Sequence, residues 1–202
     1  MVYNWKCVLP RLWKEKRIIM RNFRKIGSSE EVNLLEYTRA MIEKYPNVKI
    51  YIGCDSQNFG PKTVYATTVV FRHSNNGAHV IYRKESIPRV RDLWTKLWGE
   101  LSRSIDVAGY LKVEGGINIH QIDMDYNTNP KHKSNVILKT AVGYVESMGY
   151  RYAVKPDTLL AISAANELCR WNKISYLSIR YKIKYYEENF RLHNGISCIS
   201  YL

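Results

Sequence analysis

The sequence predicts an α/β fold in which helices flank a mixed sheet of three antiparallel strands and further parallel strands. Three observations support this prediction. Runs rich in Val, Ile, Thr and Tyr recur along the middle of the chain, an Asn-Gly turn joins two of them, and segments with helical spacing of apolar residues alternate with the later runs. A chain of 202 residues suits one domain with extensions.

Residues 1–27 are the predicted basic N-terminal extension. They contain eight Lys and Arg residues against one Glu, interspersed with Trp5, Trp13 and Phe23. Two interpretations stay open at this point. The segment is either a basic helix that lies on nucleic acid or membrane, or a leader without such a role.

A helix and a buried strand follow this extension. Ser28 and Glu31 match a capping box, which predicts that a helix opens there, and Pro46 is expected to end it. The next run, Ile-Tyr-Ile-Gly-Cys-Asp-Ser-Gln at 50–57, is typical of a buried strand and places Asp55 at its end. Because a lone buried anion is costly, Asp55 either caps the next turn or belongs to a site.

Two further runs, 63–71 and 78–86, are joined by the turn Ser-Asn-Asn-Gly at 74–77. This pattern predicts a β-hairpin, and with the preceding strand it makes an antiparallel three-stranded meander.

The following segment has the apolar spacing of a helix. Its predicted buried stripe consists of Trp94, Trp98, Leu101, Ile105 and Ala108, and its predicted outer face carries Asp92, Lys96, Arg103 and Asp106. Glu100 falls at the margin of the stripe, where we expect a half-buried carboxylate aimed at the sheet. The alternative is an ordinary boundary glutamate.

A second apolar strand, 117–125, also ends in carboxylates. Strand alternation puts Asp123 and Asp125 on one face and His120 on the other. His120 is expected to be a core residue, since a lone histidine on an apolar strand is usually one.

Two helices and a short strand complete the predicted domain. A helix at 134–148 closes with Gly149 as its C-cap, and a strand at 150–154 follows. Lys-Pro-Asp at 155–157 is expected to open the last helix, with Asp157 at the N-terminal end of its inner face. That face consists of small residues suited to close packing on a sheet, namely Ala161, Ala164, Ala165 and Leu168.

The predicted order is strand, strand, strand, helix, strand, helix, strand, helix, which is the order of the ribonuclease H-like fold. Between residues 48 and 170 the chain resembles the YkuK family of ribonuclease H-like proteins. The stretches that carry the resemblance are Ile-Gly-Cys-Asp-Ser-Gln at 52–57, Asp-Tyr-Asn-Thr-Asn-Pro at 125–130 with Lys-Ser-Asn at 133–135, Gly-Tyr to Met-Gly at 143–149, and Lys-Pro-Asp at 155–157.

The resemblance implies that Asp55, Glu100 and Asp125 are the acidic cluster of a metal-dependent phosphodiesterase, with Asp157 as the fourth member. Two Mg²⁺ or Mn²⁺ ions roughly 3.5–4 Å apart would activate water and stabilise the leaving oxygen. Such hard ions prefer oxygen ligands, which explains the carboxylates.

Two other residues, Asp123 and Asn166, are not expected to belong to the acidic cluster. Asp125 is nearer than Asp123 to the end of its strand, so we expect Asp125 to be the ligand and Asp123 to be structural. Asn166 departs from the family pattern, in which an aspartate often stands at that place. It lies about 180° around the helix from Asp157, so only one of these two can face the site.

The net charge of +13 and a pI near 9.6 are typical of a protein that binds a polyanion. Most of this charge lies at the ends, with +7 in 1–27 and +3 in the C-terminal extension, 171–202. Apolar and basic residues alternate over 177–185, which predicts a C-terminal β-hairpin. Its basic residues would contact a phosphate backbone or would only protect an edge strand, and they include Arg180, Lys182 and Lys184.

The cysteines and the length of the apolar stretches indicate where the protein acts and with what kind of partner. Four cysteines lie far apart without a CxxC pair, which indicates reduced thiols and a cytoplasmic protein. No apolar stretch approaches the ~18 residues of a membrane span, so nucleic acid and not a membrane is the expected partner. Two functions remain: a nuclease that cuts RNA, an RNA–DNA hybrid or structured DNA with Mg²⁺ or Mn²⁺, or a nucleic-acid-binding protein that keeps the fold without catalysis.

Overall fold

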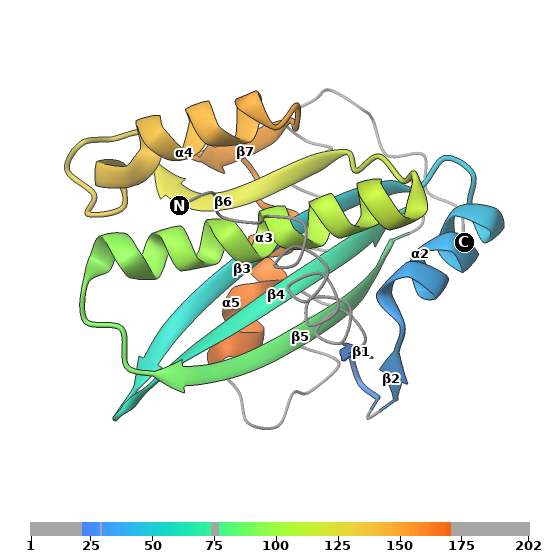
Figure 1. The fold of residues 1–202 in the computed structure, drawn as a ribbon, viewed down its shortest axis with the longest axis horizontal. Helices are drawn as coiled ribbons and strands as arrows, with labels where there is room; N and C mark the ends of the chain where they lie inside the picture. The colour runs from blue at the N-terminus through green and yellow to red at the C-terminus, as the bar shows by residue number, and fades with distance from the viewer. Residues whose placement is uncertain (1–21, 29, 74–76, 171–202) are drawn as a thin grey trace, which may run out of the picture.

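The computed structural model describes residues 22–28, 30–73 and 77–170 of the chain. Its centre is one seven-stranded sheet with the strand order β2-β1-β5-β4-β3-β6-β7 (Figure 1). The strands are β1 (Phe23–Lys25), β2 (Glu31–Val32), β3 (Lys49–Phe59), β4 (Lys62–Arg72), β5 (Ala78–Pro88), β6 (Gln121–Asn127) and β7 (Tyr152–Lys155). β3, β4 and β5 pair antiparallel, whereas β6 joins β3 and β7 joins β6 in parallel. The predicted α/β fold with a mixed sheet is confirmed.

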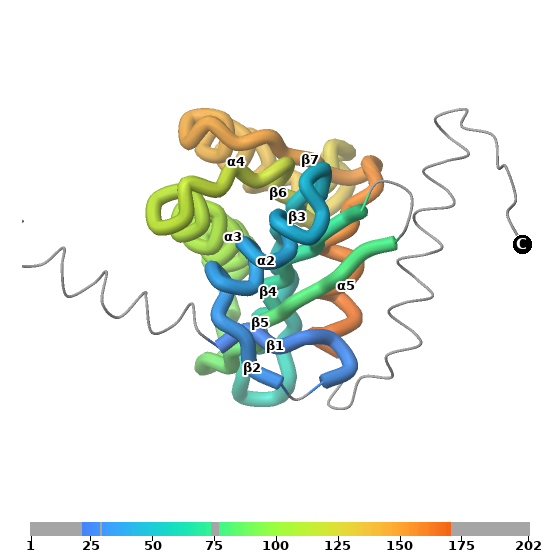
Figure 2. The backbone as a smooth tube through the Cα atoms, turned by 90° about the vertical axis from the view of Figure 1, so that its right-hand side faces the viewer, coloured from blue at the N-terminus to red at the C-terminus, as the bar shows by residue number. Residues whose placement is uncertain are grey.

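Helices cover both faces of this sheet (Figures 1 and 2). The helices are α2 (Leu34–Lys44), α3 (Leu93–Gly115), α4 (Asn135–Ser147) and α5 (Leu160–Arg170). α3 and α4 lie on one face with α2 beside the end of α3, and of the described helices only α5 lies on the opposite face. No helix in the described part of the chain is long and apolar enough to cross a membrane.

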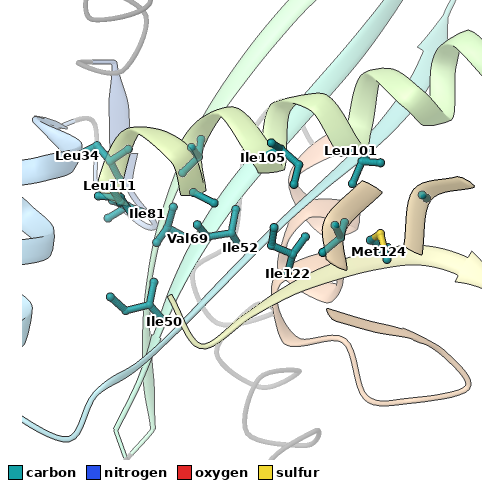
Figure 3. Close-up of a cluster of buried hydrophobic side chains, with 14 of the residues drawn as sticks. Leu34, Ile50, Ile52, Val69, Ile81, Leu101, Ile105, Leu111, Ile122 and Met124 are labelled. Atoms are coloured by element: carbon teal, nitrogen blue, oxygen red, sulfur yellow. The ribbon is translucent and has the colours of Figure 1, made fainter. Parts of the chain in front are cut away.

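The main core fills the space between the sheet and α3 (Figure 3). Ile52, Val69, Ile81, Leu101 and Leu111 are all buried there. At roughly 25 cal/mol per Å² of buried apolar surface, such side chains supply most of the driving force for this packing.

A second, smaller core lies under α5 and is built from small residues. Ala161, Ala164 and Ala165 pack against Tyr51 and Val70 of the sheet. This confirms the predicted inner face of the last helix. Gly53 makes the contact closest, because a Cβ atom there would lie 2.9 Å from the Cβ atom of Ala161.

The N-terminal end of the domain differs from the prediction. The capping box is wrong: Glu31 belongs to β2, and helix α2 starts at Leu34 with the Asn33 side chain accepting hydrogen bonds from the backbone N–H groups of residues 35 and 36. β1 pairs with β5 and adds a short hairpin to the sheet edge. Phe23 is fully buried in the core, so the last residues of the expected extension belong to the sheet.

The buried face of α3 contains Leu101, Ile105 and Ala108 of the predicted stripe but differs from it at the two tryptophans. Trp94 is 39% exposed, and Trp98 is only partly buried and packs against Tyr144 of α4, with ring centroids 5.4 Å apart. Arg103, expected on the outer face, lies over the ring of Tyr65 at 3.7 Å. The two tryptophans therefore face helix α4 and solvent, and smaller residues face the sheet.

The other predicted elements occur close to their expected places. β4 and β5 form the hairpin, although the turn residues 74–76 lie outside the described part of the chain. Gly149 follows α4 with φ 76°, a conformation that favours glycine at a helix end. The expected C-terminal hairpin with Arg180, Lys182 and Lys184, and residues 1–21 of the N-terminal extension, also fall outside the described residues.

Candidate active site where strands β3 and β6 separate

The predicted carboxylates lie just beyond the point where two parallel strands stop pairing. β3 and β6 are in register from Tyr51 opposite Gln121 to Gly53 opposite Asp123. Both strands continue past this pairing, and each carries an aspartate two residues farther on, Asp55 in β3 and Asp125 in β6. Ends of neighbouring parallel strands are where ligand sites form in α/β folds, because separating strands leave room between them.

Glu100 reaches this region from helix α3 and is buried, with only 4% of its surface exposed. The expectation of a half-buried position is therefore wrong. Glu100, Ser104, Val107 and Leu111 follow one another at three- and four-residue spacing, so Glu100 lies in the middle of the buried face. Its Oε1 accepts a 2.5 Å hydrogen bond from the hydroxyl of Ser56.

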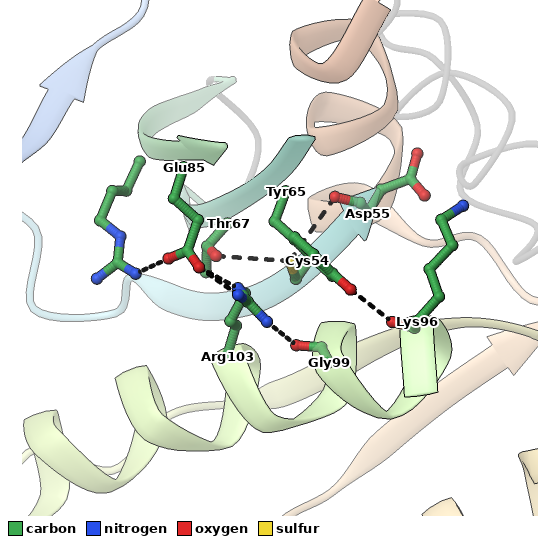
Figure 4. A network of polar contacts seen from close by, with 9 residues as sticks. Cys54, Asp55, Tyr65, Thr67, Glu85, Lys96, Gly99 and Arg103 are labelled. Atoms are coloured by element: carbon green, nitrogen blue, oxygen red, sulfur yellow. Dashed lines mark hydrogen bonds and ion pairs between the residues drawn. The ribbon is translucent and has the colours of Figure 1, made fainter. Parts of the chain in front are cut away.

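A polar network fixes the turn of α3 that carries Glu100 (Figure 4). The Tyr65 hydroxyl of β4 donates to the carbonyl of Lys96 at 3.3 Å, and Arg103 donates to the carbonyl of Gly99 at 2.8 Å. Arg103 also pairs with Glu85 of β5. α3 is thus tied to two strands on either side of Glu100, which holds this carboxyl group against β3.

Burial and repulsion by neighbouring acids raise the pKa values of Asp55 and Glu100. Burial, followed by the charge of Asp125, raises the pKa of Asp55 to about 6. Burial, followed by the charges of Asp55 and, more weakly, Asp125, raises the pKa of Glu100 to about 8. The charges of these three acids therefore act on one another, and Asp55, Glu100 and Asp125 are called the acidic cluster below.

Two lysines flank the cluster and oppose this repulsion. Lys96 lowers the pKa of both Asp55 and Glu100, and Figure 4 shows its side chain extending from α3 toward Asp55. Lys155, at the end of β7, forms an ion pair with Oδ1 of Asp125. No hydrogen bond of good geometry reaches this buried oxygen, so its contact with Lys155 is an ion pair only.

Asp123 has a different environment from Asp125. It is buried, its Oδ1 accepts from Gln121 Nε2 at 2.8 Å, and its Oδ2 accepts from the backbone N–H of Ala161 at 2.7 Å. Burial raises the pKa of this carboxyl group to about 7. Both oxygens of Asp123 accept hydrogen bonds, whereas Oδ1 of Asp125 has the ion pair with Lys155 and no hydrogen bond among the described residues.

Asp157 lies in the turn between β7 and α5. α5 begins at Leu160, so the expected place of Asp157 on the inner face of that helix is wrong. The residue is exposed in the turn after β7, where its backbone N–H donates to the carbonyl of Val154. Asp157 is not among the charges that dominate the pKa values of Asp55 and Glu100. Asn166 is half-buried on α5.

The oxygen donors of this cluster suit a hydrated hard cation better than a closed protein cage. No group of three or more His, Cys, Asp and Glu side chains in the described ranges is arranged to hold a metal ion. Mg²⁺, however, usually keeps several waters and binds through one or two carboxylates plus substrate phosphates. Asp55 and Asp125 supply such carboxylates, and Oδ1 of Asp125 is paired with Lys155 but accepts no hydrogen bond from the described residues.

Sequence reasoning did not identify Ser56, Lys96 and Lys155 as parts of the site. Lys96 carried a signal, because it precedes Glu100 by one helical turn and the two can interact. Ser56 directly follows Asp55 but points to the other face of β3, so its bond to Glu100 depends on how α3 packs.

A family model described as Ribonuclease H-like matches residues 33–170, about two thirds of the chain. No curated protein and no solved structure matches the chain. The matched range starts at the cap of α2 and ends with α5, so it contains the three carboxylates and the helices that position them. The chain belongs to the Ribonuclease H-like family, as the resemblance to YkuK proteins indicated.

Proposed function

We propose that the protein is a metal-dependent nuclease that hydrolyses phosphodiester bonds in RNA, an RNA–DNA hybrid or structured DNA. The observation that supports this most strongly is the clustering of Asp55, Glu100 and Asp125 where β3 and β6 separate. Three carboxyl groups that repel one another destabilise the fold unless they serve a cation, and the family assignment makes a nucleic-acid substrate the natural one.

Asp55 and Asp125 would hold Mg²⁺ or Mn²⁺ from the two neighbouring strands. When bound, such ions activate a water molecule and stabilise the leaving oxygen of an in-line displacement at phosphorus. Glu100, oriented by Ser56, would complete the acidic set from the α3 side. Asp157 stays the proposed fourth acid, because the turn after β7 lies at the same edge of the sheet as the end of the parallel strand β6.

The basic charge of the chain supports a nucleic-acid partner. Lys96 and Lys155 put positive charge beside the carboxylates, where phosphate groups would approach. Arg180, Lys182 and Lys184 are the proposed phosphate contacts of the C-terminal extension. The described cysteines, Cys54 and Cys169, are free and buried, which suits the cytoplasmic location that we propose.

The test is a cleavage screen on labelled single-stranded RNA, single-stranded DNA, duplex, hybrid and branched substrates with Mg²⁺ and with Mn²⁺. Asp55→Asn and Asp125→Asn should abolish cleavage, because each removes an anionic ligand without changing side-chain size. Glu146→Gln, an exposed acid on α4, is the matched control and should cleave at the wild-type rate. Cleavage that survives both aspartate substitutions would refute the assignment of the site.

The second candidate is a nucleic-acid-binding protein without catalysis. It is favoured by the absence of a three-ligand metal group in the described ranges and by the pairing of Asp125 with Lys155. This alternative predicts tight binding of at least one substrate in the same screen, with no cleavage by either metal ion and no change in binding upon Asp55→Asn.

A further inference from the structure

In the ion pair between Lys155 and Asp125, the lysine ammonium occupies the place where we propose that a metal ion binds. Lys155 is the last residue of β7 and Asp125 lies in the neighbouring strand β6. Lys155 Nζ contacts Oδ1 of Asp125. This buried oxygen accepts no hydrogen bond of good geometry from the described residues. The lysine ammonium therefore lies against the oxygen that would otherwise be free to bind another cation.

The two partners differ in exposure, and this difference indicates which of them can move. The Lys155 side chain is 49% exposed, whereas the Asp125 side chain is 24% exposed. A lysine has a flexible four-carbon stem and a compact charge, so its head can swing into solvent while the strand stays in place. Asp125 is held in the sheet and cannot follow it.

We propose that Lys155 and a divalent cation compete for Asp125, and that the displaced Lys155 ammonium then binds a phosphate oxygen of the nucleic-acid substrate. The inference rests on the proposed function, since it places the metal at Asp125. Two like charges within a few ångströms repel, so a metal ion at Oδ1 drives the ammonium away. Phosphate is a preferred partner of lysine, and the backbone of a bound substrate supplies it at the same edge of the sheet.

This role predicts two effects of opposite sign from one substitution. Removing the ammonium removes a competitor, so the metal should bind more tightly in the absence of nucleic acid. It also removes a phosphate contact, so nucleic acid should bind more weakly. If Lys155 only supported the fold, its substitution would weaken both metal binding and nucleic-acid binding or would change neither. Opposite effects on the two affinities therefore identify the proposed role.

The first measurement is the affinity of the full chain for Mn²⁺, by isothermal titration calorimetry without nucleic acid. Lys155→Met should lower the dissociation constant about threefold to tenfold, because a partly exposed ion pair is modest and the repulsion of a divalent ion adds to it. Lys155→Arg keeps the charge and should stay within about twofold of wild type. Lys139→Met makes the same change at an exposed position of α4 and should have no effect.

The second measurement is the affinity for a fluorescein-labelled RNA–DNA hybrid, by anisotropy over a range of salt with Ca²⁺ as the divalent ion. Lys155→Met should bind more weakly than wild type, and the slope of log affinity against log salt should fall by about 0.7–0.9, the value for one lost phosphate contact. Thermal unfolding verifies that each variant is folded, and Lys155→Gln provides the same charge removal if Lys155→Met does not fold.

The outcomes separate this inference from the proposed function. Unchanged or weaker Mn²⁺ binding by the neutral Lys155 variants would overturn the competition, and an unchanged salt slope would overturn the phosphate contact. Asp125→Asn tests the proposed function itself, because it should lose Mn²⁺ affinity. If Asp125→Asn binds Mn²⁺ like wild type, the metal position is wrong and the inference falls with it.

Discussion

The side chain of Asp123 accepts a 2.7 Å hydrogen bond from the backbone N–H of Ala161, in the first turn of α5. An anion at a helix N-terminus is favourable, because unpaired N–H groups and the helix dipole point toward it. This bond ties strand β6 to the helix on the opposite face of the sheet from α3. Two residues later, Oδ1 of Asp125 accepts no such hydrogen bond and pairs with Lys155. We therefore expect Asp123 to anchor the helix and Asp125 to carry the proposed chemistry.

We expect stability and activity to separate between these two aspartates. Asp123→Ala should lower the free energy of unfolding by about 2–3 kcal/mol, because it leaves the buried N–H of Ala161 without an acceptor. Asp123→Asn should cost less and keep part of the cleavage, since an amide oxygen can still accept that bond. Asp125→Asn should change stability by less than about 1 kcal/mol, as expected for a partly exposed ion pair, and should abolish metal-dependent cleavage.

Urea denaturation and the cleavage assay measure these two effects on the same preparations. The opposite ranking, with Asp123→Asn inactive and Asp125→Asn active, would show that Asp123 is the ligand.

The fold was largely predictable because its longer elements have clear periodicity. The sequences of β3 and β6 are apolar runs followed by carboxylates, and parallel pairing places Asp55 and Asp125 beyond the same end of the paired segment. β1 and β2 have three and two residues, too few for any period to be recognised. Their pairing depends on the edge of β5, which only the assembled sheet provides.

Sequence reasoning named the candidate acids but not the two lysines beside them, Lys96 and Lys155. Aspartates at the ends of apolar strands stand out in the sequence, because burying a carboxylate is costly unless a partner compensates its charge. The burial of Glu100 was misjudged because Trp94 and Trp98 dominate the apolar pattern of α3, yet Trp98 faces α4. The pairing of Lys155 with Asp125 joins residues thirty positions apart, so it follows from the registry of β6 and β7 and has no local signal.

Gly53 should resist substitution because α5 approaches β3 most closely there. A Cβ atom at this position would lie 2.9 Å from the Cβ atom of Ala161 and 3.1 Å from the backbone nitrogen of Ile162. Gly53→Ala should therefore destabilise the protein by about 1–3 kcal/mol, as overpacking of a tight core does. Because Asp55 follows two residues later, we also expect reduced Mn²⁺ affinity.

Gly143→Ala is the matched control for this prediction. Gly143 is exposed on α4, and a Cβ atom there would meet nothing within 4 Å. Alanine favours a helix over glycine, so this variant should be about 0.5–1 kcal/mol more stable than wild type. Chemical denaturation measures the free energy of unfolding of both variants. Equal effects of the two substitutions would contradict a tight contact at Gly53.

The C-terminal extension should contribute to the salt dependence of nucleic-acid binding. Its alternating sequence carries Lys182 and Lys184 at two-residue spacing, which puts both on one face if the segment is extended. Neutralising these two lysines should reduce the slope of log affinity against log salt by about 0.7–0.9 for each lost contact. Cleavage at saturating substrate should barely change. An unchanged slope would direct the search for the phosphate contacts to residues 1–27.

The buried carboxyl group of Glu100 should make stability depend on pH. Its pKa is raised from 4.5 to about 8 by burial and by Asp55, so the folded state binds more protons than the unfolded state between these pH values. Stability therefore falls as pH rises from about 5 to about 9. The pKa of Asp55, raised to about 6, acts in the same direction over the lower part of this range.

Glu100→Gln should remove much of this dependence, because glutamine keeps the shape and an oxygen that can accept from Ser56 but does not ionise. In urea denaturation with a chelator present, wild type should lose at least about 2 kcal/mol more than Glu100→Gln between pH 5 and pH 9, given about 1.4 kcal/mol per unit of pKa difference. Glu146→Gln, which neutralises an exposed acid, should follow wild type. Parallel curves for wild type and Glu100→Gln would mean that Glu100 ionises as easily in the folded protein as in the unfolded chain. The acids at the separating strands would then not need a cation to neutralise them.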